Sequence, residues 1–275
     1  MSNLNNLSTK SELFLYIIML KVMLDRLEGN PHRDHPPLKY TIELITEDLI
    51  ADSVEHLTKY FLVRENLMSS AAFLEDKVSV QVCHKFWRKV LKKGISLVAL
   101  VKVEENGEIK RRIAGINLNS IGDEDDDEED NEEDDEEDDE EDDEEDSNKK
   151  LFMLQGEAVK KTVRTMHDLE KDVDIASLYG TSKYLRAYGL SVARHYNGDG
   201  VGYQLLMTTT LLCRALGIGL IVTAFTSPLS QYLARKAGFE TIRSLDYKTY
   251  KHDGKLAYPR LDGTISLMAK RIPDS

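Results

Sequence analysis

The sequence is poor in cysteine, contains no visible internal repeat and has no apolar run of membrane-spanning length. Its two cysteines, Cys83 and Cys213, lie far apart and show no metal-ligand or disulfide-framework spacing. We interpret both as small buried apolar residues, and we expect a reducing, cytoplasmic compartment and no metal site. The apolar run at 13–20 is shorter than the roughly 20 residues that cross a bilayer. We therefore expect it to belong to an amphipathic or packing helix rather than to a targeting segment, and we expect no membrane contact.

Acidic charge is concentrated in one segment. Residues 123–146 hold 23 Asp or Glu in 24 positions, interrupted only by Asn131. The rest of the chain has 26 acidic and 36 basic residues, so it carries about +10 although the whole chain carries −13. Such dense charge cannot bury apolar surface, and a long surface loop costs little in closure entropy. We expect a disordered acidic insertion at 122–148.

The remaining pattern predicts one mixed α/β domain at 38–275, preceded at 1–37 by an N-terminal helix and a linker rich in glycine and proline. Apolar alternation or continuous apolar runs predict strands at 40–45, 97–103, 109–118, 184–192, 220–225, 239–250 and 264–270. Apolar stripes at helical spacing predict helices that begin near 46, 70, 159, 203 and 227.

Local signals predict how several elements begin and turn. Asn106-Gly107 is the pair that a type I′ turn favours, which indicates a hairpin between the two strands beside it. Thr46 and Ser227 are expected N-caps, and Pro228 suits the first position of a helix. The helix expected at 70–93 should bury one face, formed by Leu74, Val78, Val82, Phe86 and Val90.

The segment 189–206 predicts a strand, a glycine loop and a helix in succession. Gly198, Gly200 and Gly202 allow a ligand to approach the backbone, and the helix N-terminus offers amides with partial positive charge. That combination binds a pyrophosphate. A Rossmann site is disfavoured because the loop comes late and the strand at 220–225 ends without an acid. A P-loop is excluded because no Gly-Lys-Ser/Thr follows the glycines. A tight turn that requires glycine for its backbone geometry is the simpler alternative to a binding site.

The pattern from Leu190 to Leu206, with Ser227 to Phe239, resembles the GNAT superfamily of acyl-CoA-dependent N-acetyltransferases. In that family a Gln/Arg-x-x-Gly-x-Gly/Ala loop holds the coenzyme A pyrophosphate. The resemblance implies a GNAT fold with a mixed, mostly antiparallel sheet flanked by helices, acetyl-CoA as co-substrate and no metal. It implies that the coenzyme contacts Leu190, Ser191, Val192, Asn197, Gly198, Asp199, Gly200, Val201, Gly202 and Ser230. Asn197 replaces the usual Gln or Arg, and we expect the Asp199 side chain to point to solvent.

Residues 40–45, 60–67 and 266–270 narrow the resemblance to the insect-type arylalkylamine N-acetyltransferases, which acetylate dopamine, serotonin and related amines. The resemblance implies a small-molecule primary amine as substrate. It implies Glu65 as the general base, because an ammonium must lose a proton before it attacks a thioester. A solvated loop acid is the alternative interpretation of Glu65.

The same resemblance implies two hydroxyls at the leaving thiolate, those of Thr226 and Ser230, and the Val192 amide as donor to the developing oxyanion. Capping of the helix that starts near Ser227 is the alternative role for both hydroxyls. Arg64 and Asn66 stand where the subfamily usually has an acid and a proline, and Arg64 would repel a cationic amine if it faced the substrate.

Other functions stay open. A polyamine or protein-lysine acetyltransferase would use 123–146 to hold cationic substrates or basic proteins, whereas the same run as a mere solvated loop would only confer solubility. A coenzyme-binding protein with weakened catalysis would account for Arg64, Asn66 and Asn197. Nucleic acid is not an expected partner because the anionic run adjoins the basic body. We expect a monomer or a weak dimer.

Overall fold

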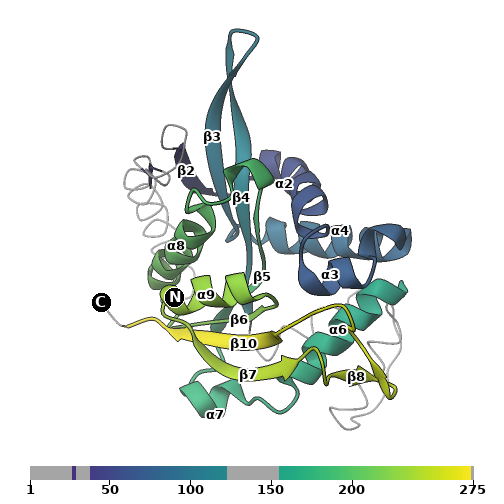
Figure 1. Ribbon diagram of the computed structural model, residues 1–275. Coiled ribbons are helices and arrows are strands. Elements are labelled where there is room, and N and C mark those ends of the chain that lie inside the picture. The colour runs from purple at the N-terminus through teal and green to yellow at the C-terminus, as the bar shows by residue number, and fades with distance from the viewer. Residues whose placement is uncertain (1–26, 29–37, 123–154, 274–275) are drawn as a thin grey trace, which may run out of the picture.

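The computed structural model describes residues 27–28, 38–122 and 155–273 (Figure 1). The acidic run, the expected helix around 13–20 and the linker at 29–37 lie outside the described residues. Leu27 and Glu28 form a two-residue strand, β1, that pairs with β2, so the expected N-terminal helix does not extend through Leu27. No helix in the described ranges is both long enough and apolar enough to cross a membrane.

One mixed sheet organises the described chain. Its strand order is β1-β2-β3-β4-β5-β6-β10-β7, and every pairing is antiparallel except that of β5 with β6. After β1 the strands are β2 (Lys39–Leu44), β3 (Leu97–Glu105), β4 (Glu108–Gly122), β5 (Tyr184–Val192), β6 (Leu220–Phe225), β7 (Glu240–Asp246) and β10 (Thr264–Arg271). A separate hairpin pairs β8 (Lys251–His252) with β9 (Lys255–Leu256). The strand expected at 239–250 therefore ends at Asp246.

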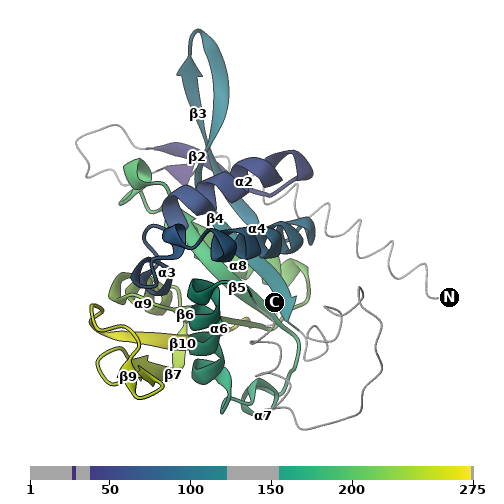
Figure 2. The same ribbon diagram turned by 90° about the vertical axis from the view of Figure 1, so that its right-hand side faces the viewer.

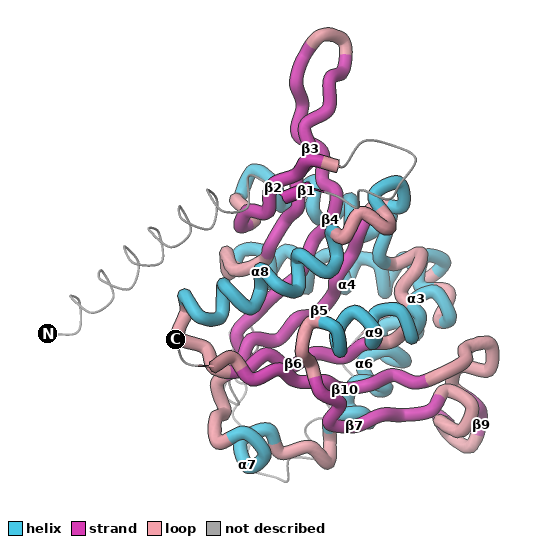
Figure 3. Tube along the Cα trace, turned by 60° about the vertical axis from the view of Figure 1, so that its left-hand side comes forward, coloured by secondary structure: helices cyan, strands magenta, loops and turns pink. Residues whose placement is uncertain are grey.

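Helices cover both faces of this sheet (Figures 2 and 3). One face carries α2, α4 and α6, and the other carries α8 and α9. The helical elements are η1 (Glu47–Leu49), α2 (Ile50–His56), η2 (Leu57–Phe61), α3 (Asn66–Ser70), η3 (Phe73–Glu75), α4 (Lys77–Lys92), α6 (Glu157–Glu170), α7 (Ile175–Tyr179), η6 (Arg194–Tyr196), α8 (Val201–Ala215) and α9 (Pro228–Lys236).

The interior of β3 illustrates why both faces need cover. Leu97, Ala99 and Val101 pack toward α8, whereas Val98 and Leu100 pack toward α2 and α4. All five side chains are buried, as a strand between two helical layers requires. The β3–β4 hairpin then extends beyond the helices and turns at Asn106-Gly107 (Figure 1), where both residues have positive φ as predicted.

The helix expected at 70–93 is corrected by the structure. Ala72 has a left-handed φ of 52°, which interrupts the helix. The helix α4 begins only after Asp76, whose carboxylate accepts a hydrogen bond from the Ser79 amide at 3.1 Å. The expected apolar face is also wrong, since Val78 and Phe86 are exposed. The residues that α4 buries are Ser79, Cys83, Trp87, Val90 and Leu91.

Three other local predictions are confirmed in whole or in part. Ser227 caps α9 with Pro228 at its first position, and both cysteines are buried and free. Thr46 stands at the start of η1, but its hydroxyl donates to the Asp48 carboxylate instead of accepting from the backbone.

Candidate active site

β5 and β6 diverge soon after they meet. They pair only at Leu185 with Ile221 and at Arg186 with Val222, while β5 continues along β4 to Val192. β5 also bulges at Tyr188, because Gly189 and Ala187 face consecutive residues of β4. Beyond the two paired positions, the edge of β5 that faces β6 has backbone groups outside the sheet ladder.

The amide of Val192 lies on that unpaired edge. The next amide, of Ala193, donates to the Ala114 carbonyl on β4 at 2.8 Å. Successive amides of an extended chain point to opposite sides, so the Val192 N–H points away from β4. This orientation suits a backbone donor to a ligand carbonyl.

The glycine loop connects β5 to α8 and has the backbone geometry that its sequence predicts. Gly198 and Gly200 have φ of 88° and 78°, a left-handed conformation that side chains disfavour. Gly200 is the N-cap of α8 and contributes no side-chain cap, and a Cβ built there would meet no atom within 4 Å. Gly202 packs so closely on Leu190 that a Cβ would lie 3.2 Å from its Cδ2. The α8 N-terminus is therefore open to an anion such as a pyrophosphate.

Asp199 corrects one expectation about this loop. Its side chain is not in solvent, because the residue is 2 % exposed. Its carboxylate lies near Tyr40 of β2. The pKa of the Tyr40 hydroxyl is raised to about 12, mainly by burial and to a lesser extent by the negative charge of Asp199. The partial positive charge at the start of α8 makes this a favourable place to bury a carboxylate.

Arg64 lies against the same loop. With the Asn197 amide oxygen turned toward it, the two terminal nitrogens of Arg64 donate to that oxygen at 2.9 and 3.1 Å. Asn197 directly precedes Gly198. The side chain that could have repelled an amine therefore faces the glycine loop.

Glu65 is held at the junction of η2 and α3. Its amide donates to the Phe61 carbonyl at 2.8 Å, and its Oε2 accepts from the Met68 amide at 2.8 Å as the N-cap of α3. Although the residue as a whole is half-buried, its Oε1 is enclosed and completes no hydrogen bond of good geometry with a described residue. Glu65 is therefore not the solvated loop acid that was its alternative interpretation.

Burial is the largest influence on Glu65 and raises the pKa of its carboxyl group. The Thr226 hydroxyl and the amides of the α3 turn oppose this rise without cancelling it. Because Oε1 lacks a well-aligned partner, the hydroxyl of Thr226 is near the carboxylate but not directed squarely at it. A carboxyl group in this setting is a stronger base than an exposed glutamate.

Two side chains fix the start of α3 against the junction of β6 and α9. The Thr226 carbonyl accepts from Asn66 Nδ2 at 2.6 Å and from the Tyr247 hydroxyl at 2.8 Å. Asn66 thus has a structural reason to replace the proline that the resemblance led us to expect. The fold brings Glu65 and Thr226 together although they are distant in sequence.

Ser230 is engaged at the start of α9. Its hydroxyl donates to the Ser227 carbonyl at 2.9 Å and accepts from the Ser227 amide at 3.2 Å, which completes a capping box. The capping role that was the alternative for Ser230 is therefore present. A role at a leaving thiolate stays a prediction for both Ser230 and Thr226.

Sequence reasoning missed two tyrosines beside Glu65. Tyr247 and Tyr258 are fully buried, with ring centroids 5.7 Å apart. Burial raises the pKa of both hydroxyls, and the nearby Glu65 charge raises each further. Both follow β7 in irregular chain, where no periodic pattern marks a buried side chain.

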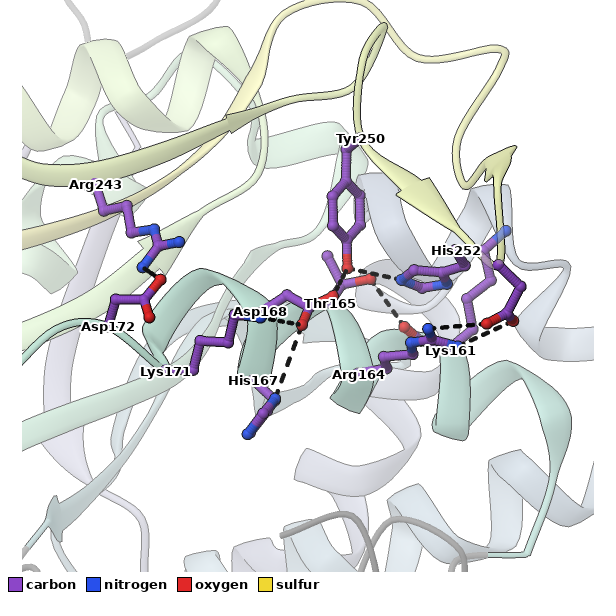
Figure 4. Close-up of polar contacts among 11 residues, drawn as sticks. Lys161, Arg164, Thr165, His167, Asp168, Lys171, Asp172, Arg243, Tyr250 and His252 are labelled. Carbon is purple, nitrogen blue, oxygen red and sulfur yellow. Dashed lines mark hydrogen bonds and ion pairs between the residues drawn. The ribbon is translucent and has the colours of Figure 1, made fainter. Parts of the chain in front are cut away.

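A polar network links α6 to Tyr250 and His252 (Figure 4), and α6 also contacts Tyr258. The Tyr258 hydroxyl lies 2.7 Å from the Thr165 hydroxyl, and its ring stacks on Tyr250. Tyr250 donates to Asp168 at 2.6 Å and lies 2.7 Å from His252 Nε2. The hairpin of β8 and β9 is thereby tied to α6.

His56 is a further titratable group that the sequence did not single out. It lies at the end of α2 and is 5 % exposed. Burial is the largest influence and lowers its pKa to about 4, although a hydrogen bond with the Ser191 backbone acts in the opposite direction. It is therefore neutral near pH 7 and adds no charge beside β5. In the described ranges, no group of three or more His, Cys, Asp or Glu side chains is placed to hold a metal.

Comparison with known proteins gives a likeness in structure rather than in sequence. No protein-family model matches the chain, and no curated protein matches it by sequence. An Aedes aegypti protein assigned as arylalkylamine N-acetyltransferase 7 superimposes with a TM-score of 0.71 at 22 % identity, over 90 % of this chain and 93 % of that one. Arylalkylamine N-acetyltransferase 2 of Aedes aegypti gives 0.67 at 22 % identity, over 85 % and 99 %.

A third solved structure, polyamine N-acetyltransferase of Drosophila melanogaster, gives a TM-score of 0.64 at 16 % identity, over 85 % of this chain and all of that one. That enzyme forms N-acetylagmatine. At these identities the likeness establishes the fold: the chain has the GNAT fold, with the mixed, mostly antiparallel sheet that the family resemblance implied.

Proposed function

We propose that this chain is an N-acetyltransferase that moves an acetyl group from acetyl-CoA to the primary amine of an arylalkylamine, with Glu65 as general base. The observation that carries the proposal is the placement of the buried Glu65 carboxylate beside Thr226, where β6 ends after diverging from β5. The GNAT fold and the insect arylalkylamine N-acetyltransferases that share it support the same chemistry.

The backbone around α8 supports coenzyme binding. Left-handed Gly198 and Gly200 lead into a helix N-terminus without a side-chain cap, which suits a pyrophosphate. The unpaired edge of β5 at Leu190 to Val192 would hydrogen-bond the extended arm of acetyl-CoA. The Val192 N–H would hydrogen-bond the thioester carbonyl and stabilise the negative charge that develops on its oxygen.

The proton chemistry follows from the surroundings of Glu65. Its carboxylate removes a proton from the ammonium of the substrate, and the neutral amine then attacks the carbonyl carbon of the thioester. The carbon–sulfur bond then breaks, the attacking nitrogen loses its extra proton, and the thiolate takes up that proton to leave as a free thiol, with the Thr226 and Ser230 hydroxyls as proposed hydrogen-bond donors to the sulfur. A raised pKa favours this role, because the base holds the proton more firmly at neutral pH.

Polyamine acetylation is the second candidate function. Its support is the overlap with the Drosophila polyamine enzyme over 85 % of this chain and all of that one, together with an acidic run that would attract polycations. Protein lysine side chains are cationic primary amines as well, so the same argument extends to them. A chain that binds coenzyme and has weakened catalysis is the third.

The test is acetyl-CoA with a panel of dopamine, tyramine, serotonin, agmatine, spermidine and a lysine peptide, followed by thiol release and by mass detection of the acetylated amine. We expect the arylalkylamines to react fastest. Fastest reaction of agmatine or spermidine would favour the polyamine function. Silence across the panel with measurable coenzyme binding would leave only the coenzyme-binding role.

A further inference from the structure

Arg64 is an exposed cation without a carboxylate counterion. In the described part of the chain no salt bridge involves it. Five other arginines of this part each face a carboxylate: Arg111, Arg112, Arg164, Arg186 and Arg243. The full charge of Arg64 is thus directed at a neutral amide, that of Asn197, where one oxygen accepts from two of the five guanidinium N–H groups.

The backbone of Arg64 is held in place at the end of η2, so the position from which its side chain reaches Asn197 is defined. Its amide donates to the Phe61 carbonyl at 3.0 Å as the chain leaves η2. Phe61 in turn packs on Gly189, where a built Cβ would lie 2.8 Å from its Cζ. The origin of the Arg64 side chain is therefore set by packing of η2 on β5, the strand that leads into the glycine loop.

Position 197 is the place where the GNAT loop pattern expects Gln or Arg, and Asn is shorter than both. We propose that Arg64 supplies the cationic contact to the coenzyme A pyrophosphate that position 197 lacks, with Asn197 orienting its guanidinium. The inference rests on the proposed function. A guanidinium binds phosphate oxygens in a bidentate manner, so the two contacts to Asn197 leave donors for this role.

The arrangement has a consequence for Glu65, the next residue in the chain. A coenzyme held by Arg64 also holds the segment that carries the general base. Coenzyme A should therefore slow hydrogen exchange of the amides at 64–68 in the wild-type protein. In an Arg64→Met variant saturated with coenzyme A, this protection should be absent although the coenzyme is bound.

The affinity test compares wild type, Arg64→Met and Arg64→Lys by calorimetric titration with coenzyme A and with dephospho-coenzyme A, which lacks the ribose phosphate but keeps the pyrophosphate. Arg214→Met is the matched control, because Arg214 is an exposed arginine at the far end of α8. We expect Arg64→Met to weaken both ligands about 10- to 100-fold, as loss of a charged hydrogen bond does, and Arg64→Lys to weaken them less. The control should bind as wild type does.

Each other outcome has a definite meaning. Failure of the wild-type protein to bind coenzyme A would overturn the proposed function and this inference with it. Binding by the wild type that Arg64→Met leaves unchanged would overturn the inference alone, as would a penalty seen only with coenzyme A and not with its dephospho form. If circular dichroism shows that Arg64→Met is unfolded, Arg64→Lys and Arg64→Gln provide the same comparison.

Discussion

Glu65 combines two roles in one side chain. One carboxylate oxygen caps α3 through the Met68 amide, which fixes the group in space, and the other is enclosed without a well-aligned partner. Burial of the carboxyl group is the main reason for its raised pKa, and the second oxygen has no well-aligned partner to offset that rise. A fixed, desolvated carboxylate is suited to accept a proton from an ammonium that binds against it.

Glu65→Gln should lower turnover by at least ~100-fold, because it removes the proton acceptor. In the wild type the acid limb of the kcat/KM profile should lie above the usual range of a glutamate, since the base must be ionised, and this limb should be missing in the variant. Exposed Glu75 provides the control Glu75→Gln, which should retain both rate and profile. An unchanged turnover in Glu65→Gln would remove Glu65 from the mechanism.

The same substitution has an opposite effect on stability. A carboxyl group with a raised native pKa resists ionisation in the folded protein, so its contribution is favourable below the unfolded-state pKa and is lost as pH rises through the native one. Relative to wild type, the free energy of unfolding of Glu65→Gln should therefore increase with pH. Urea unfolding at several pH values measures this difference, and a difference that falls with pH would contradict the account.

At the level of elements, the sequence predicted the hairpin turn more accurately than the buried face of α4. Asn106-Gly107 encodes its turn locally, because both residues tolerate positive φ. The apolar series chosen for α4 has strict fourth-residue spacing, which drifts by about 40° at each step around a helix of 3.6 residues per turn. Its members therefore spread around the helix, and the sheet selected a different face, that of Cys83 and Trp87.

The element contact that sets the site is η2 on β5, and Gly189 permits it. In Gly189→Ala the new Cβ would lie 2.8 and 3.1 Å from atoms of the Phe61 ring, although φ at this position is not left-handed. We expect a loss of about 1–3 kcal/mol in unfolding free energy from overpacking, and relief of that loss in combination with Phe61→Leu.

Gly219→Ala is the matched control for this contact, because a Cβ there meets nothing within 4 Å and its φ is not left-handed either. It should change stability by no more than about 0.5 kcal/mol. Denaturant unfolding followed by fluorescence gives both values. Equal unfolding free energies for the two alanine variants would mean that the packing of Phe61 does not require a glycine at position 189.

At the level of the whole molecule, the main feature is that an acidic run interrupts a body of opposite charge. The run begins directly after β4 ends at Gly122, and the body it interrupts carries about +10. Arg64 beside the glycine loop is part of that positive charge. An anionic segment of this density should compete with the phosphates of coenzyme A for such a surface.

Replacing residues 123–146 by a neutral Gly/Ser segment of equal length should lower the KM for acetyl-CoA at low salt. The difference should shrink at moderate salt, since screening weakens the competition. Initial rates at two salt concentrations measure it, and the equal length controls for the connection itself. Identical KM values under both conditions would limit the run to a role in solubility.

The sequence predicted a mixed α/β domain and the glycine loop because both are encoded by local patterns: period-two strands, glycine spacing and the Ser227-Pro228 helix start. The GNAT fold itself was implied by the family resemblance. Contacts between distant segments had no such signal. The Arg64–Asn197 contact, the burial of Asp199 and the two tyrosines behind Glu65 each depend on how separate elements meet. These contacts are also the ones on which the proposed binding of coenzyme and amine depends.

The most direct test of the central claim is the initial rate of acetyl transfer from acetyl-CoA to dopamine, tyramine and serotonin, by wild type and Glu65→Gln side by side. The account predicts acetylated amine and free thiol in equal amounts from the wild type, and at least ~100-fold less from the variant. Wild-type protein that binds coenzyme A yet acetylates none of these amines would contradict it.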